Sequence, residues 1–199
     1  MRPEPTTARG RRTREKIVTT AARLMHERGL GGTPLEDVLA ESGTGKSQLY
    51  HYFGGKQDLA VAVLEHQLAR VLAAQPSLQD ETCTDLRRWR DEVLAAARES
   101  QYGNCPLGAF VGQVDDDAEL RATLARLFER WQDAITGLVR RARAAGEIAP
   151  GTSAEDLALT LLTAQQGGTA LSHLRGSPDA LARALDDVLD RHRAPGVTP

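Results

Sequence analysis

The segment from Thr33 to Phe53 constrains this chain more than any other, because it reads as two short helices joined by a tight turn. Thr33, Pro34 and Glu36 have the pattern of a helix N-cap, a proline in the first turn and a capping-box glutamate. Gly43 falls where the backbone must turn. Two short helices joined in this way form a helix-turn-helix, whose second helix can enter the DNA major groove. The segment therefore predicts a DNA-binding regulator.

The two predicted helices separate buried positions from exposed ones. In the first, Leu35, Val38 and Leu39 follow the spacing of one buried face. In the second, Leu49 and Phe53 lie four residues apart, and we expect them to anchor the helix to the core. Polar side chains are left to face phosphates and base edges. They are Lys46, Ser47, Gln48, Tyr50, His51 and Tyr52.

Residues 40–47 also resemble a phosphate-binding P-loop, although Ala40 stands where that motif has its first glycine. A P-loop has to follow a buried strand, because the end of the strand places the loop under the phosphates. The residues upstream are instead charged and helically spaced, and no other stretch reads as a parallel-strand core. The helix-turn-helix is therefore the stronger interpretation.

The run from Gly29 to Leu59 resembles the N-terminal domain of TetR/AcrR-family transcriptional repressors. The matching positions are Gly29, Thr33, Ala40, Gly43, the block Leu49-Tyr50-His51-Tyr52-Phe53, Lys56 and Leu59. The resemblance implies an all-α fold with a three-helix DNA-binding domain and a basic N-terminal arm in residues 1–56. It implies a helical ligand-binding and dimerisation domain in residues 57–199. The expected protein is a homodimer that binds a palindromic double-stranded DNA operator and is released by a small-molecule effector.

The resemblance also assigns site residues, with Thr33, Tyr52 and Lys56 expected at phosphates. Three positions depart from the family, which usually has a hydrophobic residue at Thr44, Ser at Gly45 and Gly at Ser47. These departures leave the cap of the recognition helix undefined. The full predicted DNA-binding set is Thr33, Thr44, Lys46, Ser47, Gln48, Tyr50, His51, Tyr52 and Lys56.

The composition agrees with a helical regulator and offers no support for an enzyme. With 199 residues and 4% aromatic residues, the chain suits one or two small helical domains. It has no apolar run long enough for a membrane span and no signal peptide, so we expect a cytoplasmic protein. Cys83 and Cys105 have no metal-ligand spacing, and the histidines have no paired metal spacing. We therefore expect no metal, cofactor or catalytic set.

The net charge of −2 conceals a basic N-terminal region. Residues 1–58 carry ten Lys and Arg and seven Asp and Glu, which is a net charge of +3 and leaves −5 for the remainder. Such asymmetry orients a protein toward DNA. Much of the positive charge lies in residues 9–16, which form either a disordered arm that touches DNA or merely a soluble tail.

Caps and breakers predict about nine helices. Their expected bounds are about 12–28, the two helices of the helix-turn-helix, 56–74, 84–100, a short helix ending at 114, and then 115–145, 153–174 and 178–192. The last two contain many small residues, including Gly167 and Gly168, which cost helix stability. Close helix approach at a dimer contact is one explanation for these glycines, and ordinary packing within one chain is the alternative.

A ligand pocket is predicted from the aromatic and sulfur-containing residues of the C-terminal domain, for an apolar or aromatic effector. Its candidate residues are Leu64, Leu68, Trp89, Tyr102, Cys105, Leu107, Phe110, Phe128, Trp131 and Gln165. The alternative is that the aromatic residues are simply core. Residues 102–108 are similar to the Cys-Pro-Leu-Gly stretch of a TetR subgroup that senses drugs, flavonoids or electrophiles. Cys105 is accordingly either a sensing thiol or a buried free cysteine.

The alternative from a different class is a helical small-molecule-binding protein or enzyme in which the helix-turn-helix is incidental. It predicts metabolite or nucleotide binding without the salt-dependent DNA affinity of a regulator.

Overall fold

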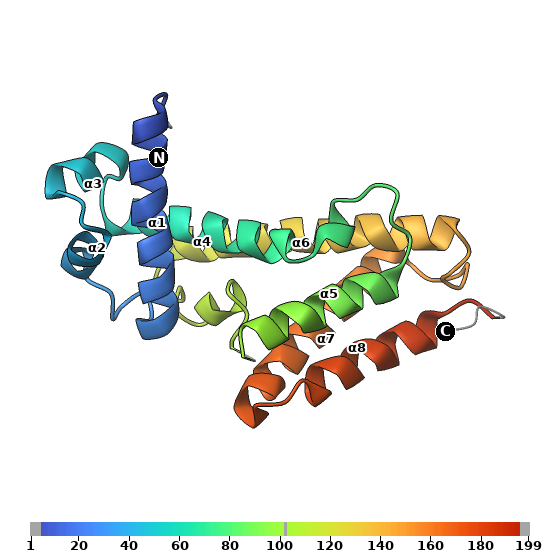
Figure 1. Cartoon of the computed structure of the whole chain (residues 1–199). Helices are drawn as coiled ribbons and strands as arrows, with labels where there is room; N and C mark the ends of the chain where they lie inside the picture. Colours follow the sequence, from blue (N-terminus) through green and yellow to red (C-terminus); the bar gives the residue numbers. More distant parts are fainter. Residues whose placement is uncertain (1–4, 102, 196–199) are drawn as a thin grey trace. The chain divides into compact units, whose positions relative to one another are not determined.

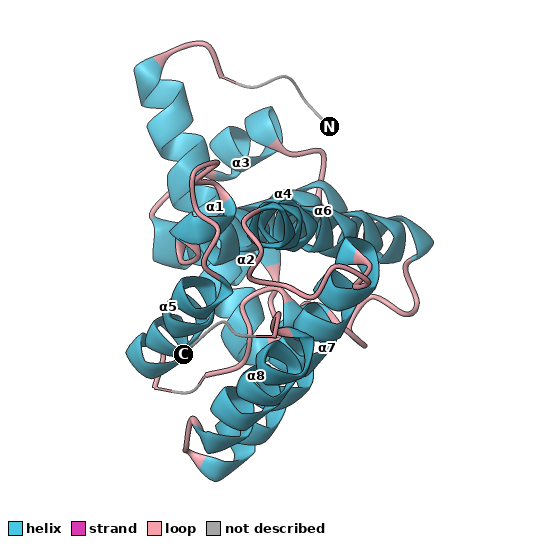
Figure 2. Ribbon diagram, turned by 90° about the vertical axis from the view of Figure 1, so that its right-hand side faces the viewer, coloured by secondary structure: helices cyan, strands magenta, loops and turns pink. Residues whose placement is uncertain are grey.

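The computed structural model describes residues 5–101 and 103–195, which form eight α-helices, two short 3-10 helices and no strand (Figures 1 and 2). In chain order the elements are α1 (Ala8–Arg28), α2 (Leu35–Ser42), α3 (Lys46–Tyr52), α4 (Lys56–Ala73), η1 (Pro76–Leu78), α5 (Leu86–Glu99), η2 (Gly108–Phe110), α6 (Ala118–Ala144), α7 (Ala154–Arg175) and α8 (Asp179–His192). The predicted all-α class is confirmed. Among the described helices, none is long and apolar enough to cross a bilayer.

Residues 40–47 lie in α2, in the turn that follows it and at the start of α3. Because these residues follow helix rather than strand, the P-loop interpretation is wrong.

The chain divides into two compact units. The first is Met1–Arg70 with Ala109–Leu127, and the second is Val71–Gly108 with Phe128–Pro199. The boundaries fall inside α4 and α6 and between Gly108 and Ala109. The first unit contains the helix-turn-helix, and the second contains α5, α7 and α8.

In the first unit, α1 begins earlier than the sequence pattern predicts. The Thr7 hydroxyl caps it by accepting a hydrogen bond from the Gly10 N–H at 3.1 Å, so the helix starts at Ala8 rather than near residue 12. The basic cluster at residues 9–16 is therefore helical and does not form a disordered arm. At the other end Gly29, with φ of +79°, terminates the helix as predicted.

The predicted short helix ending at residue 114 is wrong. Only Gly108–Phe110 forms a 3-10 turn, and Gly112, with φ of +83°, directs the chain out of helical geometry. The next helix begins at Ala118 because Asp117 caps it. The Asp117 carboxylate accepts hydrogen bonds from the Glu119 and Leu120 N–H groups at 3.1 and 3.0 Å.

In the second unit, α7 and α8 lie side by side (Figure 1). A Cβ at Gly168 would lie 2.7 Å from the Leu181 Cα, so this glycine permits the close approach of the two helices. A Cβ at Gly167 would have no neighbour within 4 Å. Packing within the chain therefore explains Gly168 and leaves Gly167 unexplained.

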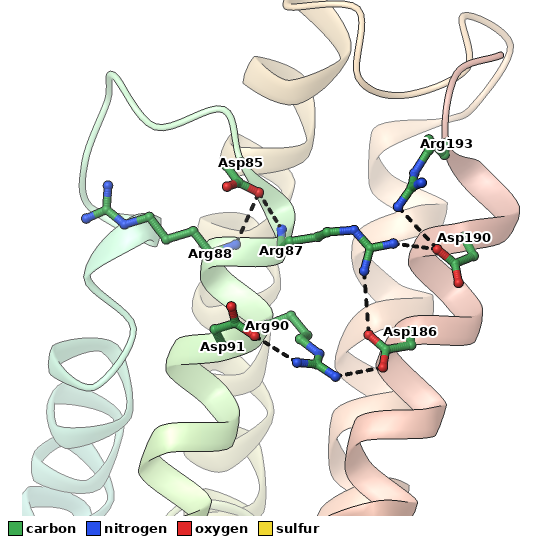
Figure 3. Close-up of polar contacts among 8 residues, drawn as sticks. All are labelled: Asp85, Arg87, Arg88, Arg90, Asp91, Asp186, Asp190 and Arg193. Atoms are coloured by element: carbon green, nitrogen blue, oxygen red, sulfur yellow. Dashed lines mark hydrogen bonds and ion pairs between the residues drawn. The ribbon is translucent and has the colours of Figure 1, made fainter. Parts of the chain in front are cut away.

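Ion pairs connect α5 to α8 within the second unit (Figure 3). The Arg90 guanidinium binds Asp186 at 2.6 Å and Asp91 at 2.7 Å. Arg87 binds Asp190 at 2.5 Å and lies 3.8 Å from Asp186. Burial disfavours the charged form of Arg90, but the two carboxylates outweigh this effect and raise its pKa. These arginines therefore hold two helices together.

Candidate DNA-binding site

The entry to the helix-turn-helix differs from the predicted capping box. Pro34 occupies the N-cap position of α2 without a side-chain cap, while the Thr33 side chain is fully buried. The Thr33 hydroxyl donates to the Gly29 carbonyl at 2.8 Å and so stabilises the end of α1 instead. Sequence spacing alone could not distinguish these roles, because both satisfy a backbone group at a helix end.

The turn between α2 and α3 is built largely as predicted. Gly43 adopts the left-handed conformation, with φ of +61°, and its N–H binds the Leu39 carbonyl. The Ser42 and Thr44 hydroxyls share a hydrogen bond of 2.7 Å beneath the turn. Ser42 is fully buried, so this bond fixes Thr44, which remains half-buried.

The cap of α3 was not foreseen from the sequence. Gly45 is the N-cap residue, and the Gln48 side-chain oxygen accepts a hydrogen bond from the Gly45 N–H at 3.0 Å. Gln48 therefore acts as the N3 residue of a capping box. A glutamine three residues after the N-cap is the sequence pattern from which this cap could have been predicted. The Gln48 side chain, which the sequence predicts to contact bases, therefore also stabilises the start of α3.

The exposed face of α3 agrees with the predicted division of residues. Leu49 is fully buried and Phe53 nearly so, and these two side chains anchor the helix. Lys46, Ser47, Gln48 and His51 are exposed, and Tyr50 is 39% exposed. The Lys46 ammonium lies 6.0 Å from the centre of the Tyr50 ring. One side of a seven-residue helix thus presents a cation, a hydroxyl, a phenol and an imidazole.

Two further predicted residues lie at the edges of this face. Tyr52 is half-buried, and its hydroxyl lies 3.5 Å from the position that a Cβ on Gly10 would take, so it packs against α1. The Lys56 ammonium lies 3.5 Å from the Gly31 carbonyl, in the loop that leads into α2. Asp58 accepts a hydrogen bond from the Gly54 N–H at 2.9 Å and thereby holds the turn after α3.

Three of the predicted pocket residues come together in the second unit. The indole N–H groups of Trp89 and Trp131 both donate to the Gln75 side-chain oxygen, at 2.8 and 3.3 Å. The Phe128 ring stacks on Trp131 with 6.0 Å between ring centres. Gln75 was not predicted, since a glutamine between two helices carries no recognisable pattern. Gln165 is also buried, and its side-chain oxygen accepts no hydrogen bond from the described residues.

The other pocket candidates are separated between the two units. Leu64, Leu68 and Phe110 are buried in the first unit, and Leu107 is buried in the second. Tyr102 lies outside the described residues.

Cys105 has the surroundings of a structural thiol. Its sulfur accepts hydrogen bonds from the Gly108 N–H at 3.3 Å and from the Gln166 side-chain nitrogen at 3.7 Å. Burial raises the pKa of the Cys105 thiol above its ordinary value, despite these hydrogen bonds. A raised pKa leaves little thiolate, which is the form that reacts with electrophiles. By surface area the Cys105 side chain is half-buried, and its two hydrogen bonds and raised pKa favour a structural free cysteine over the sensing thiol.

Comparison with known proteins identifies the family. Residues 17–63 match the family described as "Bacterial regulatory proteins, tetR family", and residues 83–188 match "Tetracyclin repressor-like, C-terminal domain". The chain belongs to the TetR family. Relatives of the chain are named as transcriptional regulators, and this protein is a TetR-family transcriptional regulator.

Characterised and solved relatives agree with this assignment. The chain is 27% identical over 179 residues to the transcriptional regulator AcuR of Cereibacter sphaeroides, covering 84% of this chain and 79% of AcuR. A TetR regulator from Chloroflexus aurantiacus has a similar structure, with a TM-score of 0.74, 26% identity and coverage of 94% and 100% of the two chains. A regulatory protein TetR from Rhodobacter sphaeroides shares the fold, with a TM-score of 0.79, 21% identity and coverage of 92% and 99%. Membership of the Cys-Pro-Leu-Gly subgroup stays a prediction.

Proposed function

We propose that this TetR-family regulator is a repressor that binds a palindromic operator as a dimer and is released by a small molecule. The observation that carries the proposal is the exposed face of α3, where Lys46, Ser47, Tyr50 and His51 project away from the buried Leu49. Hydrogen-bond donors on one side of a short helix, with an apolar anchor on the other, suit insertion into the major groove.

Different contacts are assigned to the residues around α3. Lys56 and Tyr52 are proposed to bind phosphates at the edge of the groove. Gln48 and Thr44 are assigned mainly to holding the helix and its turn, because each is engaged in a local hydrogen bond. The Thr33 side chain is left out of the phosphate contacts because it is buried.

A footprint of the purified protein on DNA flanking its own gene, at two salt concentrations, tests the proposal. We expect a protected two-fold-symmetric site whose affinity falls steeply as salt rises, since phosphate contacts release counterions. Replacing Lys56 by Ala should weaken binding to every sequence and lower the salt slope by about one for each bound subunit. Absence of protection there and in a selection from random duplexes would contradict a DNA-binding role.

The dimer is proposed to form through α7, next to α8. Leu159, Leu171 and Leu174 of α7 are 51%, 46% and 79% exposed, and Gly167 has no neighbour. Exposed apolar side chains along one helix mark an interaction face. Leu171→Glu should give a monomer in sedimentation and lose two-fold operator binding. Val111→Glu is the matched control, because Val111 is 63% exposed but lies outside α7.

The effector is proposed to be a small apolar or aromatic molecule that carries a hydroxyl or N–H group. The cluster of Trp89, Phe128 and Trp131 supports an aromatic partner, and the unpartnered oxygen of Gln165 supports a hydrogen-bond donor. Trp89 and Trp131 are the chain's two tryptophans, so their fluorescence can screen candidate compounds. A true effector should shift operator affinity by about 5–150-fold, the usual range of allosteric coupling. The proposal includes neither catalysis nor a cofactor, and DNA as the partner implies action in the cytoplasm.

A further inference from the structure

The first half of α1 carries an unusual density of positive charge. Five of the eight residues from Arg9 to Lys16 are Arg or Lys, and Glu15 is the one acid among them. All eight residues are helical, so each side chain has a defined direction. The value of these cations for binding depends on which of them already have partners within the protein.

The cations of the second half of α1 have acidic partners. Arg23 pairs with Glu27 at 3.0 Å and also with Glu41 of α2. Arg28 pairs with Asp37 of α2 at 3.0 Å. These arginines connect helices of the first unit and are largely neutralised for an approaching anion.

Two cations of the first half are engaged as well. The Arg11 guanidinium donates to the Thr6 carbonyl at 2.7 Å, and Arg14 lies over the Phe53 ring at 5.4 Å. Arg9, Arg12 and Lys16 remain. All three are exposed, and no carboxylate among the described residues lies within ion-pair distance of them.

The three unpaired cations share one side of α1. Their spacing of i, i+3 and i+7 places them in one stripe along the helix. The Lys16 ammonium lies 3.7 Å from the position that a Cβ on Gly43 would take, at the turn between α2 and α3. Tyr52 packs against Gly10 near the start of α1. Figure 1 shows this end of α1 beside α3. At its Lys16 end the stripe therefore reaches the turn of the helix-turn-helix.

We propose that Arg9, Arg12 and Lys16, here called the α1 row, form a second DNA contact that grips backbone phosphates beside the bases faced by α3. The inference rests on the proposed DNA-binding function. Long cationic side chains without acidic partners among residues 5–101 and 103–195 suit phosphate oxygens, which carry no sequence information. The α1 row accordingly adds affinity for all duplexes alike, while α3 supplies the discrimination.

The test uses the full-length protein and two 30-base-pair duplexes, a footprinted operator and a random sequence. Kd is measured over a series of salt concentrations for the wild type and for an Arg9→Ala, Arg12→Ala and Lys16→Ala triple variant. We expect the triple variant to lose affinity for both duplexes by the same factor. Its log–log salt slope should fall by about two to three for each bound subunit, because each phosphate contact contributes about 0.9.

Single variants separate a local contact from the effect of net charge. Lys16→Ala and Arg11→Ala each remove one cation per subunit from the same helix, but only Lys16→Ala should lower the slope, by about one for each bound subunit. A double variant, Glu15→Lys with Lys16→Glu, keeps the net charge and moves the cation about 100° around the helix. It should lose affinity as well, whereas attraction by net charge alone predicts no change.

The outcomes distinguish the inference from the function on which it rests. If the triple variant keeps the wild-type slope and affinity, or if the double variant binds like the wild type, the α1 row is overturned and the α3 site stands. If the wild type binds neither duplex at low salt, the proposed function fails, and the α1 row fails with it. Unchanged melting temperatures in the absence of DNA would confirm that the substitutions act on binding and not on folding.

Discussion

Two arginine-rich helices of this protein use the same side chain for different purposes. On α5, Arg87 and Arg90 face carboxylates of α8 and connect two helices of the second unit. On the first half of α1, Arg9 and Arg12 have exposed guanidinium groups with no acidic partner among the described residues. Each of these two segments contains four arginines, so the number of arginines does not separate them. The positions of the acids decide which arginines stabilise the fold and which are available to DNA.

The largest stability effect that would test this contrast is expected from Arg90→Ala. Arg90 is only 22% exposed in its side chain, and its loss would leave Asp186 without its closest cation. We expect unfolding in urea to show a loss of about 1.5–3 kcal/mol, as for other hydrogen bonds to charged groups. The salt slope of DNA binding should not change.

Arg88→Ala is the matched control on the same helix. Its side chain is 52% exposed and lies 3.6 Å from Asp80 and 3.4 Å from Glu92. Glu92 is only 15% exposed, but it also accepts two hydrogen bonds from Ser77, so the loss of the exposed arginine should cost only about 0–1 kcal/mol. A salt slope that fell with Arg90→Ala as far as with Lys16→Ala would break the distinction between structural and DNA-facing arginines.

Gly167 and Gly168 of α7 offer a similar comparison between a residue that packs within the chain and one that does not. Gly168→Ala places a methyl group 2.7 Å from the Leu181 Cα. Overpacking typically costs about 1–3 kcal/mol. The higher helix propensity of Ala returns up to about 1 kcal/mol. Because the neighbouring atom belongs to the backbone and cannot easily move, the overpacking cost should lie in the upper part of its range. We therefore expect a net loss of about 1–2 kcal/mol, measured by urea unfolding at one fixed protein concentration.

Gly167→Ala should behave differently, because it meets nothing within its own chain. The isolated subunit should gain stability from helix propensity, by up to about 1 kcal/mol. If α7 forms the dimer contact with close approach at this glycine, sedimentation should show weaker association. Equal losses of subunit stability for both alanine variants would contradict the assignment of only Gly168 to packing within the chain.

Local sequence signals predicted the helices well because local chemistry determines many helix ends. Gly29 and Gly43 were recognised because a positive φ favours glycine. Thr33 was misassigned because its hydroxyl faces the Gly29 carbonyl across the loop, which no spacing rule specifies. The short helix before Val114 failed at Gly112 for a similar reason, since its backbone geometry depends on the fold of the whole loop.

The candidate site was only partly predictable, because partners distant in sequence decide which groups are available. The exposed residues of α3 followed from its apolar anchors Leu49 and Phe53. The pairing of Arg90 with Asp186, 96 residues away, could not be read from the pattern of α5. The same holds for the α1 row: Glu15 is adjacent to Lys16 in sequence, yet no carboxylate of the described residues lies within ion-pair distance of the row.

A smaller effect is expected at Gln113, a neutral side chain that joins two segments of the first unit. Its oxygen accepts a hydrogen bond from the Leu30 N–H at 2.8 Å, directly after α1. Gln113→Ala should cost about 0.5–1.5 kcal/mol and increase hydrogen exchange at the Leu30 amide. Gln113→Glu retains the acceptor and should protect that amide. Equal exchange in the two variants would show that this contact does not hold the end of α1.

The smallest effect concerns acid stability, through His66 of α4. Burial and the charge of Arg70 lower the pKa of His66, and Glu15 of α1 partly opposes them. The unfolded chain, with a histidine pKa of about 6.5, takes up a proton first, so stability is lost as pH falls below this value. His66→Gln should flatten the dependence of unfolding free energy on pH between about 7 and 5. An unchanged slope would assign this acid sensitivity to other groups.

His66 also sharpens the interpretation of the double variant with Glu15 and Lys16 exchanged. Removing Glu15 and placing a cation there should lower the pKa of His66 further, so that the variant loses more stability than the wild type in mild acid. At about pH 8 His66 is neutral in both states, and the two proteins should be similarly stable. Suppose that the double variant binds DNA more weakly at pH 8 and is also less stable in mild acid. These two results together would place Glu15 and Lys16 on different sides of α1. One side faces α4 and affects folding, and the other faces DNA.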